Sequence, residues 1–213
     1  MKKRVISFLL ALGLVCALLT GCAGGGDEAK LEGTWATTLE LADQFNKEFE
    51  AGGMGDYIQV DSFPLVMTIQ FKSDGTYAAM ADEEALNDTM EGLRGTIRGG
   101  LSDYAQSLIE GEGWDASVEE VFEAMGTSLD GLVEEFFQEV DVSSMVADTA
   151  MEGNFKARGG KLHLSDGLDH LVDPKMYDVY ELEGDTLTLL ESVGGGETDQ
   201  FAGLYPLTLK KVG

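Results

Sequence analysis

Short segments in which apolar and polar residues alternate occur in both halves of the chain, and they predict β-strands. Turn residues such as Asp74-Gly75 separate neighbouring segments, as they do in β-hairpins. The segments cover residues 33–41, 63–72, 76–81, 153–157, 161–164, 177–182, 186–190 and 204–212. Eight strands of this kind can close into an up-and-down antiparallel barrel.

The spacing of apolar residues changes to three and four between the two groups of strands, which is typical of amphipathic helices. The helical insertion covers about residues 82–151, and a shorter helix is predicted at 42–51. Ser117 and Glu120 form a capping-box pattern before a second helix, and a third is expected over 128–140. The apolar face of the first long helix is formed by Leu86, Met90, Leu93, Ile97, Leu101, Tyr104 and Leu108. We therefore expect an α+β protein in which an eight-stranded barrel is capped by a helical insertion.

The N-terminus has the features of a secretory signal. Three basic residues in the first four positions precede an apolar run over 5–19, which is short for a transmembrane helix. Leu19-Thr20-Gly21-Cys22 resembles the lipobox of bacterial lipoproteins. That resemblance implies cleavage before Cys22 and diacylglycerylation of its thiol. The alternative is an ordinary secretory signal in which Cys22 is incidental.

The domain organisation follows from this resemblance. Residues 1–21 would be the signal peptide, 22–30 a flexible lipidated tether, and 31–213 the barrel domain with its insertion. The expected location is the extracytoplasmic face of a cell membrane, where two or more acyl chains anchor a protein stably.

Charge excludes one class of partner. The chain has 14 basic and 39 acidic residues and a formal net charge of −25. Removing residues 1–21 would remove three basic side chains and no acidic ones, which takes the charge to −28. Nucleic-acid binding needs a basic surface and is not expected. Because anionic headgroups repel an acidic protein, we expect the domain to stand off the membrane, held by its lipid.

Three further motifs resemble bacterial lipocalin-like lipoproteins. They are Leu31-Glu32-Gly33-Thr34-Trp35, the hairpin 71–77 with sequence FKSDGTY, and the hairpin 180–189 with sequence YELEGDTLTL. The resemblance covers residues 31–81 and 152–213, and it implies a barrel that holds a ligand and carries out no reaction. Trp35, Phe71 and Tyr77 are its candidate ligand-binding residues. The alternative for Trp35 is a core residue that fills the barrel.

Catalytic and metal-binding chemistry is sparse in the sequence. No nucleophile elbow, Cys-x-x-Cys motif or calcium loop occurs, so we expect no enzyme activity, metal or cofactor. His163 alternates with two leucines in a strand, and we expect it to face solvent. His170, with Asp166, Asp169 and Asp173, could form a weak metal site, but a polar loop is the favoured interpretation.

Two hypotheses for function remain. The first is a lipid-anchored, non-enzymatic protein that binds a small apolar ligand inside the capped barrel. The second is a surface interaction or structural module whose filled barrel binds a protein partner. A lined but empty interior would favour the first, and a filled interior with an exposed apolar patch would favour the second.

Overall fold

The computed structural model describes residues 27–138, 140–194 and 205–212. The expected signal peptide 1–21, Cys22 and the tether up to residue 26 lie outside the described residues. The chain forms two compact units, a barrel unit (27–39, 66–83 and 143–212) and a helical unit (40–65 and 84–142).

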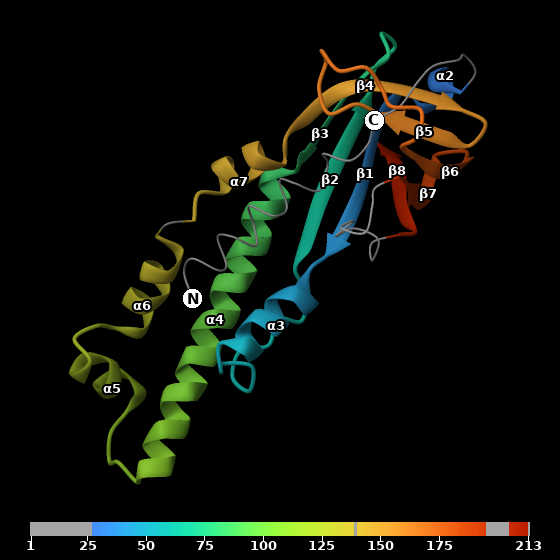
Figure 1. Cartoon of the computed structure of the whole chain (residues 1–213). Helices are drawn as coiled ribbons and strands as arrows, with labels where there is room; N and C mark the ends of the chain where they lie inside the picture. Colours follow the sequence, from blue (N-terminus) through green and yellow to red (C-terminus); the bar gives the residue numbers. More distant parts are fainter. Residues whose placement is uncertain (1–26, 139, 195–204, 213) are drawn as a thin grey trace. The chain divides into compact units, whose positions relative to one another are not determined.

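Eight antiparallel strands form the closed barrel predicted from the sequence, in the order in which they occur along the chain (Figure 1). The chain passes through a helical insertion between the third and fourth strands, which confirms the expected fold class. Strand β8 pairs with β1 and closes the barrel, with Trp35 opposite Lys211. The strands are β1 (Gly33–Glu40), β2 (Pro64–Phe71), β3 (Thr76–Ala81), β4 (Met151–Arg158), β5 (Lys161–Leu164), β6 (Tyr177–Glu183), β7 (Thr186–Val193) and β8 (Leu207–Val212).

Alternate residues of these strands point inward and form one hydrophobic core. Trp35 on β1, Phe71 on β2 and Phe155 on β4 are all at most 2% exposed. The Phe71 and Phe155 rings lie 4.8 Å apart between centroids. The remaining members of this core cluster are Leu31, Tyr77, Ala157, Leu162, Leu164, Tyr180, Leu187, Leu189 and Leu209.

The end of the predicted tether is structured. Residues Glu28–Leu31 form a single helical turn, α2, and Leu31 is fully buried in the barrel core. The Trp35 indole Nε1 donates a hydrogen bond of 2.7 Å to the Leu31 carbonyl. Burial, together with the negative charges of Asp27 and Glu28, raises the pKa of Tyr180 to about 12. The composition of residues 22–30 indicated flexibility, but burial of Leu31 and its hydrogen bond to Trp35 hold this turn against the barrel.

The helical insertion contains one more helix than the sequence indicated. The helix expected before the insertion is α3 (Ala42–Ala51), and the helices expected within it are α4 (Glu83–Glu112), α5 (Val118–Ala124) and α6 (Leu129–Phe137). The capping box of Ser117 and Glu120 is present at the start of α5. The additional helix, α7 (Val142–Thr149), lies largely in the barrel unit, and its single turn of apolar spacing was too short to recognise.

The buried face of α4 differs from the prediction in its second half. Ala105 and Ile109 are buried there, whereas Tyr104 and Leu108 are 37% and 38% exposed. From Ile97 onward the buried or half-buried apolar residues recur every four positions. Because an α-helix has 3.6 residues per turn, the buried face rotates gradually around the helix axis. Among the described residues, no helix combines the length and apolar character needed to cross a membrane.

Candidate functional site

An apolar cavity of about 200 Å³ lies in the helical unit, and we call it the helical pocket. Its lining comes from α3 and the segment that follows, from the middle of α4 and from α6. The lining residues are Phe49, Met54, Ile58, Ile97, Leu101, Leu132, Glu135 and Phe136. Seven of these eight side chains are apolar, so the pocket favours an apolar ligand.

The segment after α3 is held in place by hydrogen bonds and by a close backbone approach. The Asn46 side chain accepts a hydrogen bond of 2.8 Å from the Val60 N–H and donates one of 3.0 Å to the Val60 carbonyl. A Cβ on Gly100 would lie 2.4 Å from Ile58 Cγ1 and 2.5 Å from the Tyr57 carbonyl oxygen. The absence of a side chain at Gly100 therefore lets this segment pack directly on α4.

Two surface ion pairs join α6 and α4. Arg94 pairs with Glu134, and Arg98 Nε lies 2.6 Å from an oxygen of Asp130. The hydrogen bond and charge of Asp130 raise the pKa of Arg98 above its usual value. The Arg94 guanidinium also lies 4.7 Å from the centroid of the Phe137 ring. These contacts lie on the same two helices as the pocket residues Leu101, Leu132 and Phe136.

The size and lining of the helical pocket limit what it can hold. An engineered cavity of about 150 Å³ lined by Leu, Ile and Phe stays dry and binds benzene. The helical pocket is slightly larger and similarly lined, so it fits a single small aromatic or aliphatic group. The exposed Glu135 carboxylate is the polar member of the lining, and no nucleophile or histidine accompanies it.

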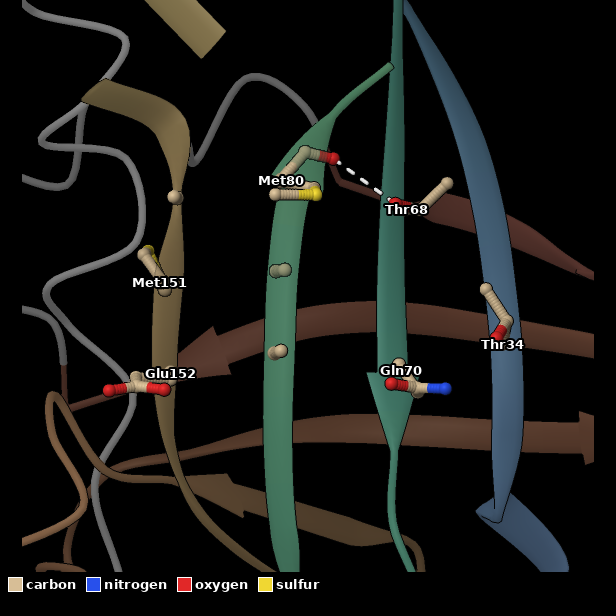
Figure 2. A pocket seen from close by; sticks show the side chains of 9 residues that line it. Thr34, Thr68, Gln70, Met80, Met151 and Glu152 are labelled. Carbon is tan, nitrogen blue, oxygen red and sulfur yellow. Dashed lines mark hydrogen bonds between the residues drawn. The ribbon is translucent and has the colours of Figure 1, made fainter. Parts of the chain in front are cut away.

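A wider groove of about 530 Å³ lies on the barrel unit, over strands β1 to β4 (Figure 2). Most of the residues that line this groove alternate along their strands with the buried residues Trp35, Phe71 and Tyr77, so they belong to the outer face of the sheet. Thr68 Oγ1 donates a hydrogen bond of 3.3 Å to the Met80 carbonyl across two of these strands. The lining residues are Thr34, Thr68, Gln70, Ala78, Ala79, Met80, Ala150, Met151 and Glu152. Ala78 and Ala79 have small side chains, which leaves this part of the groove hollow.

The three ligand-binding residues predicted from the resemblance lie together in the barrel core. Trp35, Phe71 and Tyr77 are 0%, 2% and 1% exposed and belong to the same core cluster. The Tyr77 hydroxyl donates a hydrogen bond of 2.7 Å to the Ser165 carbonyl. None of the three lines the helical pocket or the groove over β1 to β4.

The environments of the two histidines differ. His163, expected to face solvent, is only 8% exposed, so that prediction is wrong. Its Nδ1 lies 3.1 Å from the Met176 carbonyl, and its ring packs on Tyr177 at 5.4 Å, which explains its burial. His170 is hydrogen-bonded to Asp166. In the part of the chain that the structure describes, no three His, Cys, Asp or Glu side chains are grouped as a metal site.

The helical pocket could be anticipated in part from the sequence. Ile97 and Leu101 belong to the predicted apolar face of α4, and Leu132 and Phe136 are apolar residues of the helix predicted over 128–140. That these faces leave a cavity between them depends on side-chain packing, which apolar spacing alone does not give. Comparison with protein-family models, with curated proteins and with solved structures gave no match.

Proposed function

We propose that this protein is a non-enzymatic lipoprotein, anchored through Cys22 at the extracytoplasmic face of a membrane, and that it binds a small apolar ligand in the helical pocket. The observation that carries the proposal is the apolar lining of a cavity of about 200 Å³ by three separate segments of the helical unit. The lipobox and the lipocalin-like motifs support the membrane location and the absence of catalysis.

The filled core of the barrel supports the helical unit as the ligand site. Trp35 and Phe155 are fully buried and Tyr77 is 1% exposed, so these large side chains occupy the inside of the barrel. A ligand in their place would have to displace packed aromatic side chains, at a cost of several kcal/mol. The helical pocket needs no such rearrangement.

Two measurements test the proposed ligand. Native mass spectrometry of the full chain purified from its own host would show a retained apolar molecule. Binding of toluene by ligand-observed NMR would test the cavity directly. We expect Leu101→Trp, which fills the pocket, to weaken toluene binding by about ten-fold or more. Leu108→Trp is the matched control, because it makes the same change on α4 outside the pocket lining, and it should leave binding unchanged.

Equal toluene binding by the two variants, or no binding by the parent chain, would contradict the ligand proposal. The filled barrel would then favour the second candidate, a surface interaction module. Its binding face would be the groove over β1 to β4 (Figure 2). A photo-crosslinker at Ala78, inside that groove, should then capture a protein partner in native membranes, whereas one at Lys175 should not.

A further inference from the structure

Three basic side chains gather on the β4–β5 hairpin, and we call them the basic patch: Lys156, Arg158 and Lys161. In the strand register Arg158 lies directly opposite Lys161, and Lys156 lies opposite His163. Lys156 and Arg158 alternate with the buried Phe155 and Ala157, so they are on the outer face of the barrel. Like charges placed directly across a pair of strands repel each other and destabilise the hairpin.

The patch contrasts with the rest of the molecule. It holds three of the eleven basic residues that follow the predicted signal peptide, in a mature chain of net charge −28. Among the described residues, none of its three members forms an ion pair. Lys161 Nζ instead lies 4.0 Å from the centroid of the Tyr177 ring. Basic side chains that are not held in ion pairs can contact an external anion.

Acidic side chains also lie around this hairpin. Asp74 precedes Gly75, whose carbonyl accepts a hydrogen bond of 2.8 Å from the Phe155 N–H, and the Asp74 carboxylate accepts one of 3.0 Å from the Thr76 N–H. Glu181 on β6 lies two residues beyond Val179, which pairs with Lys161. Asp27 and Glu28 bind the backbone of the hairpin, where the Gly159 N–H donates to Asp27 at 3.1 Å and the Ala157 N–H donates to Glu28 at 3.3 Å. Asp27 also pairs with Lys30 at 2.7 Å.

These same contacts fix where the chain leaves the barrel toward its N-terminus. Asp27 is attached to the turn between Arg158 and Lys161, and it lies five residues after Cys22. Five extended residues span at most about 18 Å. A lipid on Cys22 would therefore hold this hairpin close to the membrane surface, within reach of long basic side chains.

We propose that the basic patch contacts the anionic headgroups of the membrane in which Cys22 is anchored, and so orients the barrel. This inference rests on the proposed lipid anchor. The hairpin is attracted to the bilayer, while the strongly acidic remainder of the protein is repelled. The domain is then held with the side that carries the basic patch toward the membrane, and it does not rotate freely on its tether.

The first test maps the contact on the full lipidated chain. The protein is reconstituted in vesicles of phosphatidylcholine alone, or of phosphatidylcholine and phosphatidylglycerol in equal amounts, and its lysines are labelled with a water-soluble amine reagent. We expect Lys156 and Lys161 to react several-fold more slowly on the anionic vesicles than in detergent. Lys47 and Lys175 should react equally on the anionic vesicles and in detergent. High salt should abolish the protection, because it shortens electrostatic range to about 3 Å at 1 M.

A charge-reversal variant gives the second test. Arg158→Glu replaces a repulsive cross-strand pair with an attractive one, but its carboxylate lies close to Asp27 on the Gly159 N–H, so the folding of the variant is checked by its thermal unfolding midpoint. The folded variant should lose the protection of Lys156 and Lys161 on anionic vesicles. Lys175→Glu, which makes the same change of charge outside the patch, should keep that protection.

The outcomes separate the anchor from the patch. A chain that floats with vesicles but shows equal labelling of Lys156 and Lys161 in every condition would overturn the patch and leave the anchor standing. A mature chain without acyl groups on Cys22 would overturn the anchor, and with it the role of the patch.

Discussion

One carboxylate at the boundary of the helical unit stabilises three separate groups. Glu40 accepts hydrogen bonds from the Phe63 N–H, from the Ser62 hydroxyl at 2.7 Å and from the Ala42 N–H at 3.1 Å. Burial raises the pKa of Glu40, but these hydrogen bonds outweigh burial, and the pKa is lowered below its ordinary value of 4.5. A charged Glu40 therefore fastens the start of α3 to the segment that precedes β2.

This lowered pKa predicts a loss of stability in acid. The stabilisation is fully present above the ordinary pKa and is lost as the pH falls through the lower, folded-state value. We expect Glu40→Gln to lower stability at pH 7 and to flatten the dependence of stability on pH below about 4.5. Chemical denaturation across this range measures both effects. Glu48→Gln, an exposed change on α3, is the control, and an equal effect of the two variants would contradict the assignment.

Individual residues are also where sequence and structure differ most. The motifs made Trp35, Phe71 and Tyr77 candidate ligand-binding residues, and all three lie in the barrel core, because strand alternation decides which side a residue takes. Whether an inward aromatic lines a cavity or fills it depends on its neighbours, and here Phe155 and Leu31 pack against these side chains. His163 shows the same limit, since its contacts with Met176 and Tyr177 come from a loop and the following strand.

At the scale of elements, the five glycines of α4 make different contributions. Gly100 lies against Tyr57 and Ile58, whereas a Cβ on Gly99 would meet no atom within 4 Å. A helical glycine in open space costs about 1 kcal/mol relative to alanine. Only at Gly100 does the chain gain a close contact in return.

Two neighbouring substitutions should therefore have opposite effects. Gly99→Ala should raise the free energy of unfolding by about 0.5–1 kcal/mol. Gly100→Ala should lower it by about 1–3 kcal/mol, because the new methyl group overlaps Ile58 and the Tyr57 backbone. Thermal or urea denaturation checks both, and stabilisation by both variants would show that the segment after α3 does not need this contact.

The elements themselves could largely be predicted from the sequence. Strands β3 and β5 and helix α3 have the predicted bounds, because turns such as Asp74-Gly75 and the stop at Gly52-Gly53 mark their ends. Helix α4 could be predicted in place but not in its full buried face. Helices α2 and α7 are short, and the contacts that stabilise them, such as burial of Leu31, come from residues distant in the sequence.

For the whole molecule, charge is the dominant feature. With 39 acidic and 14 basic residues, the folded state brings many like charges together. Self-repulsion of this kind opposes the compact state and is screened by salt. The ion pairs of Arg94 and Arg98 lie at the surface and contribute little in comparison.

We therefore expect the protein to become more stable as sodium chloride is added at neutral pH. The midpoint of thermal unfolding should rise between low salt and about 0.15 M, where the screening length is about 8 Å. Differential scanning calorimetry at several ionic strengths measures this. A midpoint that falls with salt would mean that specific ion pairs outweigh the general repulsion.

The position of the insertion affects how the barrel can form in time. Strands β3 and β4 are direct neighbours, yet residues 82–150 separate them along the chain. Closing so long a connection costs entropy before the pairing gives any return, which slows folding. Two hydrogen bonds join the ends of this connection, from the Ser143 hydroxyl to Glu83 at 2.6 Å and from the Ala81 N–H to Thr149 at 2.9 Å. These two hydrogen bonds bring the ends of the connection together and so shorten the loop that β3–β4 pairing must close. We therefore expect the pairing of β3 with β4 to be a late step in folding, which follows the contact between α4 and α7.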